Sequence, residues 1–415
     1  MDIENIIKFI QESIPLLEEH GGKIATRLYE LLFSRNPELL NIFNIANQKG
    51  GKQQLALSST ILHIAKHVEK IPEILPAVKK ISHKHVALGI KPEHYLLVGE
   101  SMLTAIHEVL GDDLATPEMM QAWSDVYDLI SSAFCDVESE IYEDVEDKSG
   151  GWDGLREFVI AKKVEETPDI TSFYLKPQDG KLISSYDALN YITTSIEVND
   201  IIHLRHYSIS DYPIPSNPRR KNPDYYRITV KKIPGNCSKG SQAGVISNHL
   251  HNNTKEGDII NLSAPNGEDF NMHESNEPLI LIGAGVGITS CFALMKATLH
   301  LQPKRKIIFI QRHKNSEAAP FREELKTIIE NNENEKKTLK VITSYSHPLD
   351  SDQSDHSGEI DKPWLEGIVQ EYSELSNVFL CGPVPFMKHV NSLLKEIGFE
   401  KERVIYELFG PLADI

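Results

Sequence analysis

The sequence is short of cysteine, of basic residues and of long apolar runs, and each shortage excludes a class of protein. Its four cysteines are far apart among 415 residues, so we expect neither a disulfide framework nor a zinc site with paired cysteines. The 43 basic and 60 acidic residues give a net charge of -17, which argues against nucleic acid or an anionic membrane as a partner.

No apolar run approaches the roughly 18 residues that a membrane span needs. Residues 1–5 are acidic where a secretory signal would be basic. We therefore expect a cytoplasmic protein without a membrane anchor. The composition, 40% apolar and 25% charged, is that of an ordinary globular chain with two or three domains.

Apolar residues recur at helical spacing from residue 3 to about 145, as at Ile3, Ile6, Ile7 and Ile10. Prolines beside acidic residues mark helix starts at Pro37, Pro92 and Pro117. We predict an all-α domain over residues 1–147.

A glycine-rich hinge, residues 148–154, separates this region from short β-branched and aromatic runs. The runs at 158–164, 170–175, 201–210, 226–233 and 258–262 predict an antiparallel β-barrel over residues 152–272.

From Pro278 the apolar run 279–282, a glycine turn, a helix at 290–300 and a strand at 306–310 form a βαβ unit. Further strands are expected at 339–344, 377–380 and 404–408, which predicts an α/β domain with a parallel sheet over residues 276–415. The polar segment 330–337 is expected to be a solvated loop.

Three patterns carry chemistry, and each also has an ordinary structural interpretation. His85, on a predicted helix, is a candidate haem ligand, and because residues two apart face different sides, only one of His83 and His85 can point into a pocket. Arg205-His206-Tyr207-Ser208 ends a predicted strand with groups suited to a flavin. Gly283, Gly285 and Gly287 lie between a strand and a helix, where a pyrophosphate can approach backbone N–H groups, although the spacing is not the full dinucleotide motif.

Their order along the chain resembles that of the flavohaemoglobins. The resemblance covers nearly all 415 residues and rests on short segments at 28–30, 36–38, 43–44, 91–95 and 406–411, together with Gln53, Leu57, His85 and Glu138. It implies a globin domain followed by a ferredoxin-reductase-type module, in which the barrel binds FAD and the α/β domain binds NAD(P)H.

For the globin part, the resemblance implies that haem b binds through His85 as the proximal ligand. Tyr95 and Glu138 would form a hydrogen-bonded relay to the outer nitrogen of His85. On the opposite side of the haem, Tyr29 and Gln53 would stabilise bound oxygen, while Phe43 and Leu57 would line the pocket. Without the resemblance, Phe43, Leu57, Tyr95 and Glu138 would be assigned to core or surface.

For the flavin site, the resemblance implies contacts from Tyr191, Arg205, His206, Tyr207, Ser208, Ser247 and Asn248. One departure concerns the residues before Tyr191: family members usually carry Pro-Gly-Gln-Tyr, whereas this chain has Ala188-Leu189-Asn190-Tyr191. We expect the backbone of this loop to differ, with an effect on the strength of flavin binding.

For the nicotinamide site, the resemblance implies two segments, Gly283, Gly285, Val286, Gly287, Ile288, Thr289 and Ser290, and Cys381, Gly382 and Pro383. The C-terminal segment Glu407, Leu408, Phe409, Gly410 and Pro411 would place an aromatic ring over the flavin. Glu407 and Lys84 would be charges between flavin and haem. Arg312 and Lys314 follow the second strand, where positive charge suits a 2′-phosphate, so NADH or NADPH is expected.

The resemblance implies a nitric oxide dioxygenase, in which NAD(P)H reduces FAD, FAD reduces the haem iron, and oxygen-bound ferrous haem converts nitric oxide to nitrate. Two alternatives stay open: an oxygen-binding or sensing globin whose reductase keeps the iron ferrous, and a reductase of peroxides or other acceptors. We expect a monomer that acts on small molecules.

Overall fold

The computed structural model describes residues 1–43, 51–70, 75–212, 222–235, 243–268, 275–335, 338–372 and 376–409. The chain divides into two compact units. One contains residues 1–156 with 193–205 and 262–268, and the other contains 157–192, 206–261 and 269–415. None of the helices in these ranges combines the length and the apolarity that crossing a membrane requires.

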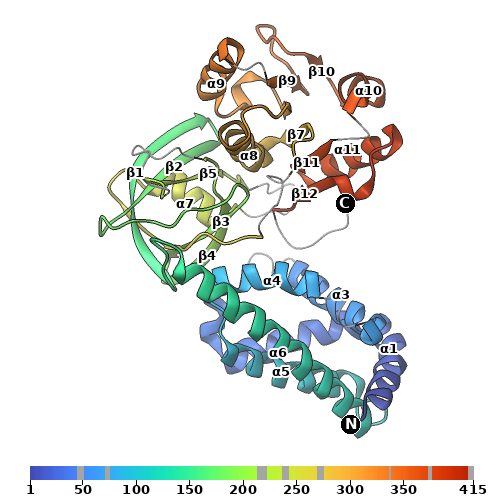
Figure 1. Cartoon of the computed structure of the whole chain (residues 1–415). Coiled ribbons are helices and arrows are strands. Elements are labelled where there is room, and N and C mark those ends of the chain that lie inside the picture. Colours follow the sequence, from blue (N-terminus) through green and yellow to red (C-terminus); the bar gives the residue numbers. More distant parts are fainter. Residues whose placement is uncertain are drawn as a thin grey trace. The chain divides into compact units, whose positions relative to one another are not determined.

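The described parts of residues 1–147 are largely helical, as their periodicity predicts (Figure 1). The elements are α1 (Ile3–Arg35), the 3-10 helix η1 (Pro37–Asn41), α3 (Lys52–Lys66), α4 (Leu75–Leu88), α5 (Pro92–Leu110) and α6 (Pro117–Asp147). Pro37, Pro92 and Pro117 each begin an element, and Thr116 caps α6 by accepting a hydrogen bond from Met119 N. α1 packs on α3, α5 and α6 around a shared apolar core.

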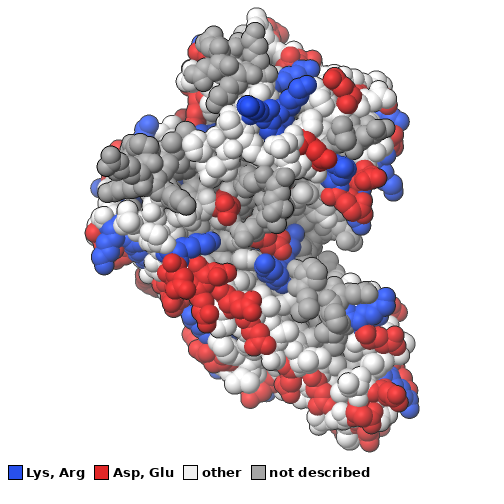
Figure 2. Space-filling model, viewed as in Figure 1, with Lys and Arg blue, Asp and Glu red and all other residues white. Residues whose placement is uncertain are grey.

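Acidic side chains gather over the C-terminal part of α6, as Figure 2 shows. The exposed acids there are Glu140, Glu143, Asp144, Glu146 and Asp147. This face therefore carries part of the excess negative charge of the sequence.

The next elements form an antiparallel sheet with the strand order β4-β3-β6-β1-β2-β5. Its strands are β1 (Leu155–Thr167), β2 (Ile170–Pro177), β3 (Tyr191–Val198), β4 (Ile201–Ser208), β5 (Tyr226–Lys231) and β6 (Ile259–Ser263), and α7 (Val245–Asn253) packs on β5. A bridge between Ile209 and Ile228 joins the extension of β4 to β5, so the two edges meet and the sheet closes as a barrel. The sequence predicted all of these strands except β3.

The last part is a parallel sheet with the strand order β10-β9-β8-β7-β11-β12. Its elements are β7 (Leu279–Ala284), α8 (Ile288–Leu301), β8 (Ile307–His313), α9 (Arg322–Glu335), β9 (Leu339–Tyr345), β10 (His356–Ser357), α10 (Lys362–Val369), β11 (Asn377–Cys381), α11 (Val384–Ile397) and β12 (Val404–Glu407). Leu279 and Leu281 pack on the α8 side, and Ile280 and Ile282 pack on the side of α10 and α11. Helices therefore cover both faces (Figure 1), as the buried run predicts.

The expectation of a loop at 330–337 is wrong for most of that segment, because α9 continues to Glu335. One of the polar residues in this segment, Asn332, has a structural role. That side chain is buried, accepts hydrogen bonds from the backbone N–H groups of Thr338 and Leu339, and donates one to Thr338 Oγ1.

The barrel and the parallel sheet share one apolar core. Ala188 and Leu189, in the loop before β3, are buried in the cluster that contains Leu281 of β7 and Phe292 of α8. Leu189 has a φ of 79°, in the left-handed region that favours glycine. The loop thus requires at Leu189 a conformation that the glycine of the family's usual Pro-Gly-Gln-Tyr adopts without strain. That its backbone differs from that of family members stays a prediction.

Candidate functional site

The helical unit encloses an apolar cavity of about 250 Å³. Five of the residues predicted for the haem pocket line it: Tyr29, Phe43, Leu57, His85 and Tyr95. Tyr29 packs against Phe43, with ring centroids 5.7 Å apart. Burial raises the pKa of Tyr29 to about 12, so its hydroxyl keeps its proton at neutral pH.

Gln53 is predicted for the same pocket but is not among the residues that line the cavity. It is half-buried on α3, one turn before Leu57. Its Oε1 atom is buried and finds no hydrogen-bond partner within the described ranges. An unsatisfied amide one turn from the cavity wall is a candidate to interact with a ligand.

Three helices bring His85, Tyr95 and Glu138 into contact. His85 Nδ1 lies 2.8 Å from Glu138 Oε1 and 2.9 Å from the Tyr95 hydroxyl, and Tyr95 donates to the same Glu138 oxygen at 2.6 Å. Only 3% of Glu138 is exposed. Burial, followed by the hydrogen bond to Glu138, raises the pKa of Tyr95 well above its ordinary value.

These contacts determine the tautomer of His85. A carboxylate only accepts hydrogen bonds, so Nδ1 carries the proton and Nε2 carries the lone pair. No hydrogen bond to Nε2 comes from the residues that the structure describes. His85 is therefore oriented as a metal ligand would be, with a free nitrogen on a residue that lines the cavity.

Sequence reasoning missed Phe134. Its ring lies against both His85 and Tyr95, with centroid distances of 5.5 and 5.9 Å, and it also lines the cavity. The signal was available, because Phe134 lies one helical turn before Glu138 and therefore on the same face of α6. Lys84, next to His85, is half-buried on α4.

The predicted flavin residues lie on three elements. Tyr191 begins β3, and its ring meets that of His206 on β4 edge to face at 5.1 Å. Ser247 and Asn248 are in the first turn of α7. Ser247 Oγ accepts a hydrogen bond from Ile233 N and donates one to Gly244 O, and the side-chain amide of Asn248 donates to the carbonyl oxygens of Ile233 and Gly244. They shape the N-terminus of that helix. Arg205 and Tyr207, also on β4, are half-buried.

The glycine turn after β7 has the openness that a phosphate group needs. Gly285 has a φ of 55°, and a Cβ atom added there would meet no atom within 4 Å, so its backbone is accessible. At Gly287 a Cβ atom would lie 2.5 Å from the carbonyl carbon of Cys381, so only glycine lets the turn pack on β11. Val286 lies between them, and Ile288, Thr289 and Ser290 form the first turn of α8, where Thr289 donates to Val286 O.

Register brings the remaining predicted residues into one row. Gly283 pairs with Cys381, and Cys381 pairs with Glu407, all at the carboxyl ends of their strands. Ser208, at the end of β4, donates a hydrogen bond to Glu407 Oε1 at 3.2 Å. The row lies where the strand order reverses around β7, which is the usual ligand position in such sheets. Burial raises the pKa of the Cys381 thiol, which favours its neutral form.

Other predicted residues surround this row. Gly382 and Pro383 lead from β11 into α11, Leu408 follows β12, and Phe409 is 48% exposed. Gly410 and Pro411 lie outside the described residues. Arg312 is buried, donates to Gly358 O at 2.6 Å and pairs with Glu359 at 3.0 Å, whereas Lys314 is exposed. Of the two, only Lys314 is available to a 2′-phosphate.

Comparison with known proteins gives the same arrangement. The globin family matches residues 26–134, and the oxidoreductase NAD-binding domain matches residues 281–392. A flavohaemoglobin from Malassezia yamatoensis, solved with bound FAD and haem, has a TM-score of 0.81 and 26% identity over 98% of this chain and 99% of its own. The FAD/NAD-binding domain of a nitric oxide dioxygenase from Vibrio cholerae covers 62% of this chain and 99% of its own, at 31% identity and a TM-score of 0.52.

Two curated relatives match along their whole length. Flavohemoprotein of Bacillus thuringiensis is 40% identical over 99% of both chains. Flavohemoprotein A of Dictyostelium discoideum is 42% identical over 99% of this chain and 98% of its own. The chain has this identity over its full length, and it combines a globin domain with an antiparallel barrel and a parallel α/β domain. It therefore belongs to the flavohemoprotein family.

Proposed function

We propose that this protein is a nitric oxide dioxygenase, which uses NADH or NADPH and oxygen to convert nitric oxide to nitrate. The observation that carries the proposal is the contact of Glu138 with both His85 and Tyr95 beside the apolar cavity. The names of two similar proteins, one a nitric oxide dioxygenase and one with bound FAD and haem, support it.

The residues present fit the cofactors that such an enzyme needs. His85 offers a free Nε2 atom at an apolar cavity, and Phe43 and Leu57 are suited to contact a haem b. Tyr191, Arg205, His206, Tyr207, Ser208, Ser247 and Asn248 would hold FAD. The open backbone at Gly285 and the row of Gly283, Cys381 and Glu407 would hold NADH or NADPH.

When bound, the haem supplies the iron at which the gases react, and FAD divides the two electrons of a hydride into single electrons. The electron count requires such a division. Nitric oxide loses three electrons on becoming nitrate and dioxygen accepts four, so each turnover needs one electron from outside. One hydride therefore serves two molecules of nitric oxide.

The chain's own residues have separate tasks in this proposal. Glu138 and Tyr95 orient His85 and raise its donor strength. Tyr29, which keeps its proton, and Gln53 would donate hydrogen bonds to a negatively charged ligand in the cavity. Cys381 would lie beside the nicotinamide, and Phe409 would cover the flavin. Lys84 and Glu407 would act as charges between the two cofactors.

We also propose that these tasks belong to three domains, at 1–147, 152–272 and 276–415, in a protein that acts as a monomer on small molecules. The globin domain would bind haem, the barrel would bind FAD, and the α/β domain would bind NAD(P)H.

The test is nitric oxide consumption by the protein loaded with haem and FAD, followed with an electrode and a nitrate assay. We expect consumption that needs both NADH and oxygen, matching nitrate formation and abolished in His85→Ala. His107→Ala, at an exposed position of α5, is the control. NADH oxidation that ignores nitric oxide would refute the proposal and leave a reductase. Very slow NADH oxidation with both gases present would favour an oxygen-binding globin instead.

A further inference from the structure

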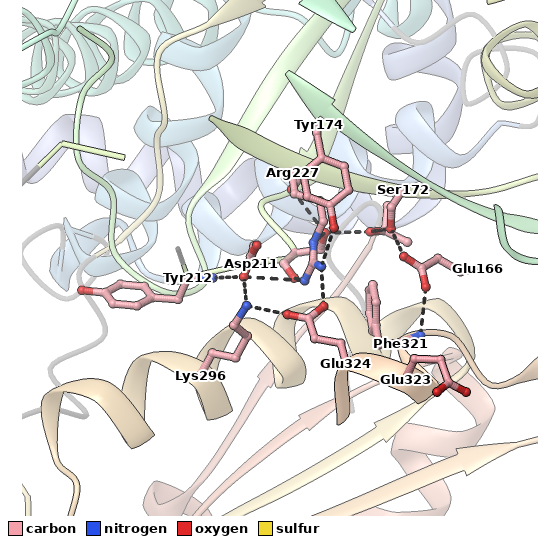
Figure 3. Close-up of polar contacts among 12 residues, drawn as sticks. Glu166, Ser172, Tyr174, Asp211, Tyr212, Arg227, Lys296, Phe321, Glu323 and Glu324 are labelled. Atoms are coloured by element: carbon pink, nitrogen blue, oxygen red, sulfur yellow. Dashed lines mark hydrogen bonds and ion pairs between the residues drawn. The ribbon is translucent and has the colours of Figure 1, made fainter. Parts of the chain in front are cut away.

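A largely buried cluster of charges lies between the barrel and the parallel sheet (Figure 3). Arg227 of β5 and Asp211, which follows β4, come from the barrel and are 1% and 2% exposed. Lys296 of α8 and Glu324 of α9 come from the parallel-sheet half. The cluster holds two cations and two carboxylates, so its charges balance.

Each charge in the cluster touches both opposite charges. Arg227 donates to Glu324 at 2.7 Å and its guanidinium lies 3.7 Å from Asp211. Lys296 donates to Glu324 at 2.6 Å and also contacts Asp211. The contacts that cross from one half to the other are therefore Arg227 to Glu324 and Lys296 to Asp211.

The surroundings keep Asp211 charged and hold Arg227 in place. Burial alone would raise the pKa of Asp211, but Arg227 and Lys296 outweigh it and lower the pKa. Tyr225 donates to the second carboxylate oxygen of Asp211 at 2.8 Å. The guanidinium of Arg227 lies 4.8 Å from the ring centre of Phe321, next to α9.

A second polar contact joins the same two halves. Glu166 of β1 accepts a hydrogen bond from Phe321 N at 3.1 Å, and its other oxygen accepts one from Ser172 of β2. Phe321 has a φ of 62°, a conformation that a non-glycine residue adopts at a cost. The barrel thus holds the start of α9 both through this backbone group and, three residues on, through Glu324.

Buried ion pairs add little net stability compared with apolar packing of the same volume, but their contacts are directional. The apolar core around Leu189 already joins the two halves, and such packing does not by itself specify one relative placement. The contacts of the charged cluster restrict that placement further, because each pair must keep its donor and acceptor within hydrogen-bond or ion-pair distance. Catalysis between groups on the two halves depends steeply on placement, since a shift of about 1 Å costs about a hundredfold in rate.

We propose that Arg227, Asp211, Lys296 and Glu324 form a positioning clamp, which holds the nucleotide-binding half on the barrel at the separation that hydride transfer from NAD(P)H to FAD requires. The inference rests on the proposed function for its catalytic part. In this step the nicotinamide loses a hydride and FAD gains it, and a proton from solvent completes the reduced flavin. The clamp residues take no part in the bond changes and act only through placement.

The test compares Glu324→Gln with Glu323→Gln in the protein loaded with haem and FAD. The first change keeps the shape of the side chain but removes a carboxylate that both cations contact. The second removes an exposed carboxylate from the next position, which Figure 3 shows without a contact to the cluster. Arg227→Lys is the second test variant, because it keeps the charge but loses the guanidinium fork.

Anaerobic stopped-flow measurement of FAD reduction by NADH gives the first readout. We expect Glu324→Gln and Arg227→Lys to lower the limiting rate constant about tenfold or more, with the half-saturating NADH concentration unchanged. A purely structural role would lower the amplitude, because fewer molecules would be folded, and would leave the rate constant of the folded fraction as in the wild type. That result would overturn the proposal.

Hydrogen exchange of residues 321–325 without NADH gives a readout that is independent of the reaction. We expect faster exchange in Glu324→Gln than in Glu323→Gln, because the start of α9 loses one of its two attachments. Equal exchange would overturn the clamp itself. If NADH does not reduce FAD in the wild type, the proposed function fails and the catalytic part of the inference with it, while the exchange still decides whether the cluster holds the two halves.

Discussion

Replacing Glu138 with glutamine tests the relay behind His85. The amide has nearly the same shape and still accepts hydrogen bonds from His85 and Tyr95, but it carries no charge. A hydrogen bond to a charged group contributes about 1.5–3 kcal/mol and a neutral one about 1 kcal/mol, so the pull on the His85 proton weakens by about 0.5–2 kcal/mol. The short distances, 2.8 Å to His85 and 2.6 Å to Tyr95, place Glu138 where this change acts directly.

A less electron-rich imidazole stabilises ferric iron less, so the potential of a haem bound to His85 should rise. At 59 mV per tenfold change for one electron, 0.5–2 kcal/mol corresponds to about 20–90 mV. If the same energy is lost in the transition state instead, turnover falls about 2- to 30-fold. Spectroelectrochemical titration of the haem-loaded protein measures the potential, and nitric oxide consumption measures the turnover.

The control is Glu140→Gln, which removes an exposed carboxylate two residues further along α6, on a different face of the helix. It should leave both quantities unchanged. If Glu138→Gln and Glu140→Gln have the same potential, the relay does not tune the iron and the reasoning from the tautomer of His85 is wrong.

Three further predictions concern the nucleotide-binding half. Burial lowers the pKa of His313 from 6.5 to about 4. The stability that the neutral His313 contributes is therefore complete above pH 6.5 and is lost as the pH falls towards 4. At pH 5 the loss amounts to about 2 kcal/mol. In urea unfolding, the stability of His313→Gln should not show this acid-dependent loss, whereas His347→Gln, at an exposed position, should keep it. Equal dependence of the unfolding free energy on pH in the two variants would contradict the assignment. Gly287→Ala should abolish FAD reduction by NADH, because its Cβ would lie 2.5 Å from the backbone of Cys381. Gly367→Ala is the control: a Cβ in this part of α10 meets open space, so the variant should raise the free energy of unfolding by about 1 kcal/mol. Lys314→Met should raise the KM for NADPH about fivefold more than the KM for NADH, because one exposed charge pair contributes about 1 kcal/mol. Equal increases would show that Lys314 does not contact a 2′-phosphate.

Local signals in the sequence predicted most elements. Helix starts were predictable because proline at the first helical position and threonine before it act within one turn, as at Thr116 and Pro117. The strands of the parallel sheet were predictable because burial on both faces leaves an unbroken apolar run such as 279–282. β3 was missed because its run, Tyr191–Val198, mixes apolar residues with polar ones. The side chains of Thr193 and Thr194 are nevertheless buried.

The candidate site was predictable where family resemblance supplied partners, as for His85, Tyr95 and Glu138. The partners of other charged residues are set by folding across long stretches of chain, and spacing does not contain them. Arg312 appeared in the sequence as a free cation, whereas folding pairs it with Glu359. Arg227 carried no signal at all, since it lies inside a strand and its partner Glu324 is 97 residues away.

The loop at Ala188 and Leu189 has a consequence for the order in which the chain can fold. The ribosome completes the barrel strands before it makes β7 and α8, against which these two side chains are buried. Until then Leu189 lacks the apolar partners from β7 and α8 that offset the cost of its left-handed backbone. A barrel produced without the nucleotide-binding half would leave both side chains without this cover, so we expect the turn to reach its final shape only after β7 and α8 have been made.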